Sequence, residues 1–201
     1  MHNEDQRKVI TVVIGIMVSL SALVWAMLGP AIKQTIFMPR DAFFFGTEGT
    51  SVLLSMAGLF VLGVSIVLLA IAFKNKKFKW GLFSSLLVIS LGLLVVSFDD
   101  YFYYTPKGIH NNNLTSIGTK VTEWDEVASL TSVYVKGESG RQTPQSLIFE
   151  LKNGEKIIRT LSGQLILARD QISDTLMAMG GKSIIQILDA KGNVLEEYSD
   201  M

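Results

Sequence analysis

Three long apolar runs dominate the first half of this chain, at residues 9–29, 52–73 and 80–98, and none of them contains a charged residue. Each is about 20 residues long, which at about 1.5 Å per residue matches the roughly 30 Å hydrocarbon core of a bilayer. A chain of 201 residues is too short to surround three such helices inside a soluble core. The sequence therefore predicts an integral membrane protein with three transmembrane helices.

The first run has a second interpretation, as a cleaved signal peptide. Arg7 and Lys8 precede it, as the basic start of a signal peptide would. The run is longer than the usual apolar region of about 7–15 residues, and no Ala-x-Ala-like cleavage site clearly ends it. We interpret it as an uncleaved anchor.

The charges divide the chain into two parts. Residues 1–98 hold eight Lys and Arg against four Asp and Glu, whereas residues 99–201 hold ten against fourteen. The second part has an ordinary single-domain size and alternates apolar with polar residues, as a soluble fold does. We expect a transmembrane region over residues 1–98 and a soluble domain over residues 99–201. The chain has no cysteine, which excludes disulfides and thiolate metal sites.

The basic residues predict an orientation in the membrane. Four lysines fall within residues 74–79, between the second and third runs, and Arg7 and Lys8 precede the first run. Short lysine-rich loops stay in the cytoplasm. The opposite side holds only Lys33, Arg40 and Lys107 near the membrane. We therefore expect a cytoplasmic N-terminus and an extracytoplasmic C-terminal domain; if one run does not cross, the domain is cytoplasmic.

The link between the first two runs, residues 30–50, is rich in aromatic residues. It contains Phe37, Phe43, Phe44 and Phe45. Aromatic side chains beside a span often lie at the headgroup level. We interpret the link as an interfacial turn, and a ligand-binding loop or a re-entrant segment is the alternative.

Polar residues within the runs are serines and one threonine, and no ionisable residue falls inside them. Transporters usually place an ionisable residue within the bilayer, so transport is expected at most as an accessory subunit. Small residues four apart, such as Gly15 and Ser19 or Ser51 and Ser55, let helices approach closely. We expect a three-helix bundle, with a homo-oligomer or a membrane-protein partner as further options.

The C-terminal part predicts an antiparallel β-sheet followed by one helix. Strand-like segments rich in β-branched and aromatic residues are separated by turn residues, and the strongest hairpin signal is Asn153-Gly154. The expected strands are residues 101–110, 114–121, 128–136, 146–151 and 156–161, with turns at 107–108, 111–113 and 137–140.

After residue 162 the apolar period changes to that of a helix. Leu165, Ala168, Ile172, Leu176 and Met179 stand three or four apart, which predicts an amphipathic helix over residues 163–179. Gly180-Gly181 follows it as a helix stop. A closing hairpin is expected from residues 183–188 and 194–198, with Gly192 in the turn.

Three motifs carry a family resemblance. Tyr-Thr-Pro-Lys-Gly-Ile at residues 104–109, Glu-Trp-Asp-Glu-Val at 123–127 and the turn at Asn153-Gly154 resemble the PH-like domain of small bacterial membrane proteins of unknown function. The resemblance spans roughly residues 101–178. It implies a split, strongly bent antiparallel sheet capped by the helix at 163–179, and it implies no activity.

Lipid-binding PH domains surround their first hairpin with cations that hold inositol phosphates. Here the corresponding segment is His110-Asn111-Asn112-Asn113, flanked only by Lys107 and Lys120. We therefore expect the lipid bilayer as a partner, without specific phosphoinositide binding and without a nucleic-acid partner.

The sequence holds no catalytic motif. His110 is the only histidine of the domain, and acidic pairs such as Glu196 and Glu197 are adjacent, so on a strand they point to opposite faces. We expect a non-enzymatic protein without catalytic residues, cofactor or metal, which presents an interaction or sensing domain at the bilayer surface. The candidate interaction surface is Trp124, Asp125 and Glu126, although a tryptophan at the start of a strand more often packs in a core.

Overall fold

The structure is a computed structural model that describes residues 2–71, 75–112, 118–161 and 163–199. Its contacts divide the chain into two compact units. The helical unit comprises Met1–Met38, Gly46–Phe102 and Asn112–Gly118, and the sheet unit comprises Pro39–Phe45, Tyr103–Asn111 and Thr119–Met201. The units interleave in sequence, so strands β1, β2 and β3, whose bounds follow below, each contribute residues to both. That the chain divides into two domains between residues 98 and 99 stays a prediction.

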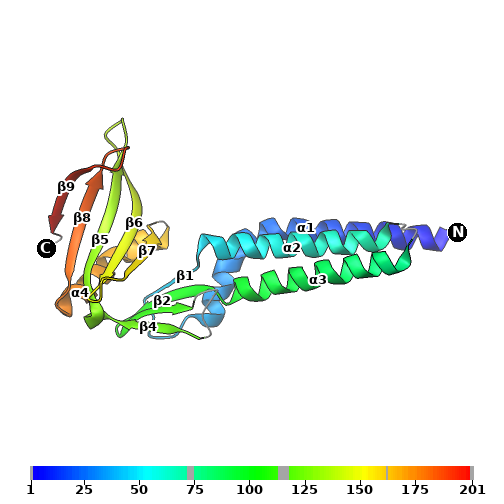
Figure 1. Cartoon of the computed structure of the whole chain (residues 1–201), viewed down its shortest axis with the longest axis horizontal. Coiled ribbons are helices and arrows are strands. Elements are labelled where there is room, and N and C mark those ends of the chain that lie inside the picture. The colour runs from blue at the N-terminus through cyan, green and yellow to red at the C-terminus, as the bar shows by residue number, and fades with distance from the viewer. Residues whose placement is uncertain (1, 72–74, 113–117, 162, 200–201) are drawn as a thin grey trace. The chain divides into compact units, whose positions relative to one another are not determined.

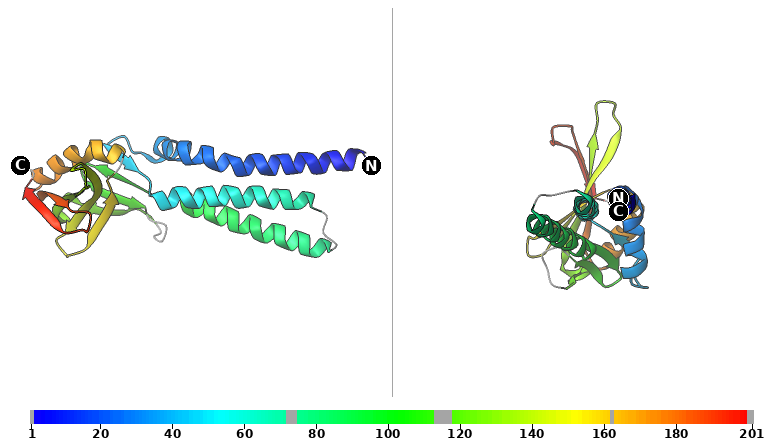
Figure 2. Two further views of the ribbon diagram at one scale, coloured as in Figure 1. Left: turned by 90° about the horizontal axis from the view of Figure 1, so that it is seen from above. Right: turned by 90° about the vertical axis from the view of Figure 1, so that its right-hand side faces the viewer.

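The helical unit contains three helices long and apolar enough to span a membrane, as the hydropathy pattern predicts. They are α1 (His2–Phe37), α2 (Gly49–Ala70) and α3 (Lys76–Phe98). Helix α2 packs against both α1 and α3 and lies between them (Figure 2). These features are those of a multi-pass membrane protein.

Helix α1 does not end at Gly29, where the first apolar run ends. It continues through Pro30 to Phe37. A membrane helix tolerates proline where neighbouring groups compensate for the lost backbone bond. Here tertiary packing holds the last turns, because the ring of Phe37 lies edge-on to Phe98 with centroids 5.6 Å apart and stacks on Tyr101 at 4.8 Å.

Small residues bring the helices close together, which confirms the prediction of close packing. A Cβ atom added to Gly15 of α1 would lie 2.7 Å from the carbonyl oxygen of Gly63 in α2. On the other side of α2, the hydroxyl of Ser90 donates a hydrogen bond of 2.8 Å to the Gly58 carbonyl. Both contacts need a residue without a side chain on α2.

The first sheet has the strand order β1-β2-β3-β4. Its strands are β1 (Phe44–Gly46), β2 (Tyr101–Thr105), β3 (Gly108–Asn112) and β4 (Lys120–Glu123). The expectation that 101–110 form one strand is wrong, and so is the turn expected at 111–113, whereas the turn expected at 107–108 is present one residue earlier. The chain turns at Pro106-Lys107, since proline and glycine favour a turn there, and Asn111 and Asn112 lie within β3. Residues 113–117, part of the expected strand at 114–121, lie outside the described residues.

Strand β1 also corrects the interpretation of the link at 30–50 as an interfacial turn. Phe44 and Phe45 are buried, and the ring of Phe44 stacks on Tyr104 with centroids 5.2 Å apart. These aromatic residues therefore form part of a protein core instead of a headgroup belt, because sheet packing buries both sides of their strand.

The second sheet has the order β7-β6-β5-β8-β9, with β7 and β9 at its edges (Figure 1). Its strands are β5 (Val127–Lys136), β6 (Gln142–Leu151), β7 (Lys156–Thr160), β8 (Lys182–Leu188) and β9 (Val194–Ser199). The hairpins predicted at Asn153-Gly154 and around Gly192 are confirmed, and both glycines have positive φ.

One pair in this sheet is not antiparallel. β5 pairs parallel with β8, so the expectation of a wholly antiparallel sheet is wrong at this position. The reason is the helix that connects β7 to β8, since a helical crossover returns the chain to the same end of the sheet and allows a parallel pairing.

That crossover is helix α4 (Gln164–Ala178), which packs against β5 and β8 as predicted. Leu165, Ile172 and Leu176 are buried. Gly180 and Gly181 end the helix by donating to the carbonyls of Met177 and Leu176, a Schellman motif. Met179 was expected on the buried face but is exposed, because it lies beyond the last helical turn.

Candidate functional site

Trp124 is buried instead of exposed on a surface. It begins a short 3₁₀ turn, η1 (Trp124–Glu126), and only 2% of its surface is accessible. Its indole Nε1 donates a hydrogen bond of 2.8 Å to the Thr105 carbonyl, and its ring packs edge-on against Tyr104. Trp124 therefore packs in the core and cannot stack on a ligand in this conformation.

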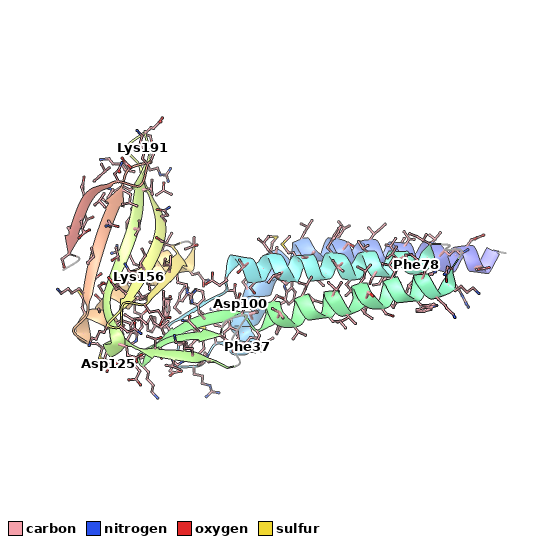
Figure 3. All side chains as sticks on the ribbon, in the orientation of Figure 1. Phe37, Phe78, Asp100, Asp125, Lys156 and Lys191 are labelled. Carbon is pink, nitrogen blue, oxygen red and sulfur yellow. The ribbon has the colours of Figure 1, made fainter. Side chains whose placement is uncertain are left out.

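Asp125 and Glu126 are exposed beside it. They lie on a turn and not on a strand, so their side chains need not point to opposite faces as those of adjacent strand residues do. The Glu126 carboxylate accepts a hydrogen bond of 3.1 Å from the Glu123 amide, which fixes the turn. Figure 3 shows Asp125 at one end of the sheet unit.

Two clefts adjoin this turn, and Asp125 lines both. One has a volume of about 320 Å³ and is lined by Lys120, Lys152 and Glu155 as well as both acidic residues. The other, of about 400 Å³, lies beside Lys107. Lys120 and Glu155 form a surface ion pair of 3.3 Å across the first cleft. The charges of both signs make this surface polar, and an interaction role for Asp125 and Glu126 stays a prediction.

His110 lies in β3 beside an aromatic ring. Its ring stacks on Tyr103 with centroids 4.4 Å apart, and its Nε2 lies 3.0 Å from the Thr105 hydroxyl oxygen. Burial lowers the pKa of His110 below its ordinary value; the carboxylate of Asp41 opposes this shift and the cation of Lys107 adds to it. His110 is therefore held in its neutral form more strongly than a free histidine.

A buried lysine lies in the helical unit, where the sequence indicated no ionisable residue within a span. Lys33 is in α1, and only 3% of its surface is accessible. Its Nζ donates to the Ser51 hydroxyl at 2.7 Å, to the Ser97 carbonyl at 2.5 Å and to the Asp100 carbonyl at 3.3 Å. The three acceptors match the three protons of an ammonium group.

The lysine joins all three helices. Ser97 lies in the last turn of α3, where carbonyls lack partners within the helix and the helix dipole is negative. Ser51 of α2 donates to the same Ser97 carbonyl at 2.7 Å. Lys33 of α1 thus caps α3 and contacts α2 at once. Figure 3 shows Phe37 and Asp100 at this end of the helical unit.

Lys33 was missed because the apolar run was ended at Gly29. A signal was available: Ile32 and Ile36 stand four apart and continue the apolar side of the helix beyond Pro30. A proline within a span is common enough that it alone should not end a predicted membrane helix.

The edge strand β9 is the most exposed apolar element of the sheet unit. Every residue of it is exposed, including Val194, Leu195 and Tyr198 at 54%, 50% and 48%. One side of the strand pairs with β8, and the strand order ends there. In the turn before β9 the carboxylate of Asp189 accepts hydrogen bonds from the side chain and backbone of Asn193, which lower the pKa of Asp189.

Within the residues that the structure describes, no three histidines or carboxylates come together as metal ligands would. No protein-family model, curated protein or solved structure matches the chain. Its function must therefore be argued from its own geometry.

Proposed function

We propose that this chain is a non-enzymatic integral membrane protein that presents an interaction or sensing domain at the surface of the bilayer. The observation that supports this most is strand β9, an edge strand with three exposed apolar side chains. Soluble proteins usually protect such an edge, because its unpaired backbone groups and apolar side chains readily pair with another chain. Asp99 and Asp100 alone separate α3 from β2, so the chain passes directly from a span into a sheet.

We propose a PH-like relationship for the part of the sheet unit from β2 to α4. The successive antiparallel pairs and the helix that covers the second sheet support it. The parallel pairing of β5 with β8 departs from the antiparallel sheet that the resemblance implies.

We propose that the protein resides in a bacterial cell membrane with its N-terminus in the cytoplasm and its C-terminal part outside. The lysine-rich segment at residues 74–79 supports this orientation. Fusions after Met201 test it: a reporter active only outside the cell should work, and a reporter fluorescent only in the cytoplasm should not. The reverse result would place the domain in the cytoplasm.

Hydrogen exchange tests the interaction role. The full-length chain is compared in native membrane vesicles and after purification in detergent, and deuterium uptake is followed by mass spectrometry. If a partner covers β9, peptides that contain Val194–Ser199 exchange more slowly in membranes. Peptides from the exposed turn at Asn153-Gly154 serve as the control. Equal exchange of β9 in both samples would contradict the proposal.

A second candidate function is an accessory subunit of a membrane transport or export complex. The outer face of α3 favours it, because Ser85 is exposed and a Cβ atom at Gly81 or Gly92 would meet nothing within 4 Å. A groove of about 440 Å³ adjoins the end of this helix, lined by Phe37, Leu94, Val95, Phe98 and Asp99. Ser51, Ser55 and Ser90 do not contribute to this face, since all three are buried within the bundle.

A photo-crosslinker at Val88, on the outer face of α3, tests this second function. Adducts with a polytopic membrane protein would support the accessory role, and adducts with lipid alone would count against it. A crosslinker at the buried Ser90 is the matched control on the inner face.

A further inference from the structure

The two edges of the second sheet carry opposite charges. Strand β9 bears Glu196 and Glu197, and strand β7 bears Lys156 and Arg159. Within one copy Lys156 lies 3.7 Å from Glu150, Arg159 donates to Asn111 and Glu197 accepts from Gln186, so a second copy would share charges that already have partners. Both edges also expose apolar side chains, such as Leu195 and Ile158, the latter at 59%. Each edge strand has a neighbouring strand on one side only. The backbone groups on its other side can therefore pair with a strand of another chain.

We propose that β9 of one copy pairs antiparallel with β7 of a second copy, so that the sheet continues from copy to copy. This inference deepens the proposed function and rests on it, since it names the partner of the same β9 edge. The partner is a second copy of this chain.

The strand directions fit this pairing. β6 pairs antiparallel with both β5 and β7, so β7 runs in the same direction as β5. β8 is parallel to β5, and β9 is antiparallel to β8. Strand β9 therefore runs opposite to β7, as Figure 1 shows, and a second copy added in the same orientation meets β9 with an antiparallel β7.

The side chains that would meet also lie on the same face of the sheet. Residues that pair across a sheet point to the same face, and the backbone pairings form one continuous row across all five strands. The row is Glu197, Gln186, Val133, Ser146 and Thr160. Lys156 and Ile158 stand at even spacing from Thr160 and share its face. Glu197 and Lys156 thus lie on one face of the extended sheet.

One register matches the charges. When Glu197 of one copy is opposite Lys156 of the next, Glu196 is diagonal to Arg159, and the alternation stops at Leu195, the extra residue of a β-bulge between Val194 and Glu196. Opposite charges at facing positions stabilise a sheet, and like charges directly opposite destabilise it.

Charge selects this pairing over self-pairing of either edge. Two β9 strands would bring the carboxylates of Glu196 and Glu197 opposite or diagonal to those of the other copy. Two β7 strands would bring Lys156 towards Arg159. The mixed pair joins different patches, so it is a heterologous contact that produces a ring if the rotation closes and a longer row if it does not.

Disulfide trapping tests the proposed register. The chain has no cysteine, so introduced cysteines are the only thiols. Chains with Glu197→Cys and chains with Lys156→Cys are co-expressed and treated with a mild oxidant in native membranes. Opposite residues in an antiparallel pair have Cα atoms about 4.5–5.5 Å apart, within the range of a disulfide. We expect a mixed dimer, and none when Leu167→Cys on the exposed side of α4 replaces Lys156→Cys.

Charge reversal provides the second measurement, since both residues are exposed and their replacement leaves the core intact. Glu197→Lys and Lys156→Glu should each weaken association by about tenfold, and mixing the two variants should restore the Glu197–Lys156 contact in reversed form. Association is measured by energy transfer between labelled full-length copies in vesicles.

The outcomes separate this inference from the proposed function. Mixed dimers together with rescue by paired reversal support it. If β9 is protected in membranes but Glu197→Cys crosslinks only to a different protein or only to itself, the inference is wrong and the proposed function stands. If β9 is not protected in membranes, both fail.

Discussion

The helical unit and the sheet unit satisfy their polar groups in opposite ways. In the helical unit several polar side chains turn inward: Lys33 and Ser51 donate to the carbonyls at the end of α3, and Ser90 donates to Gly58. In the sheet unit apolar side chains fill the core, and the second sheet ends at two edge strands, β7 and β9. We therefore propose that the helices serve as an anchor and that a further chain binds at the sheet.

The energetic basis of the two units differs accordingly. Within a bilayer, lipid is as apolar as the side chains, so helix association depends on close packing and on interhelical hydrogen bonds. In the sheet unit the burial of apolar surface is the main driving force, at about 25 cal/mol per Å². Substitutions in each unit should reveal this difference.

Loss of the tryptophan core should have the largest effect. Trp124→Ala removes a fully packed ring and the hydrogen bond to Thr105, and we expect it to destabilise the sheet unit by about 3–5 kcal/mol. Protection of β5 and β6 amides in the full-length chain, followed by hydrogen exchange, measures this. Leu167→Ala, at a side chain that is 83% exposed, should change stability by less than about 0.5 kcal/mol. An equally small effect of Trp124→Ala would show that the aromatic core is not decisive.

Loss of the buried lysine should come next. Lys33→Met keeps most of the side-chain volume and removes three hydrogen bonds, so the Ser97 and Asp100 carbonyls lose their charged donor. We expect a loss of about 2–3 kcal/mol in the stability of the helical unit, since Ser51 still donates to Ser97. Unfolding in detergent with increasing dodecyl sulfate measures it. Lys77→Met, at an exposed lysine, is the control; equal effects of the two substitutions would contradict a role for Lys33 as a cap.

Helix spacing provides a smaller effect with a matched control. In Gly63→Ala the added methyl group would clash with the Gly15 carbonyl and with Ser19, so α1 and α2 must separate, at a cost of about 1–3 kcal/mol. In Gly92→Ala the methyl group meets nothing within 4 Å, and higher helix propensity should stabilise α3 by up to about 1 kcal/mol. The same dodecyl sulfate titration distinguishes them. If Gly63→Ala stabilised the protein as Gly92→Ala does, the α1–α2 approach would not be tight.

The smallest expected effect is a pH dependence of the sheet unit. Because the folded state lowers the pKa of His110, the unfolded chain takes up a proton first as the pH falls. The stabilisation is present above the ordinary histidine pKa of about 6.5 and is lost as the pH falls through the lower folded value. Stability measured by hydrogen exchange between about pH 7.5 and 5 should therefore decline less in His110→Gln. An identical decline in both proteins would assign the pH dependence to other groups.

The sequence predicted what periodicity and turn chemistry decide locally. Three apolar runs became three helices, Gly180-Gly181 ended α4, and the turns at Asn153-Gly154 and Gly192 formed hairpins. Each of these depends on a few neighbouring residues, so long-range context does not override it.

What the sequence did not predict depends on residues far apart. Hydropathy alone does not predict a structural role for Lys33, because its acceptors lie far away in the sequence, in α2 and at the end of α3. Phe44 and Phe45 were interpreted as interfacial aromatic residues. No neighbouring residue in the sequence indicates that their strand pairs with β2, which lies more than fifty residues further along the chain. The parallel register of β5 and β8 likewise joins segments some fifty residues apart, which no local pattern encodes.

The most direct test of binding at the sheet edge compares the two units in one experiment. A photo-crosslinking residue is placed either at Tyr198 on β9 or at Val88 on the outer face of α3, in full-length chains in native membranes. We expect protein adducts from Tyr198 and lipid adducts alone from Val88. Protein adducts from Val88 and none from Tyr198 would contradict it, because the helices would then be the binding region and the sheet edge would be free.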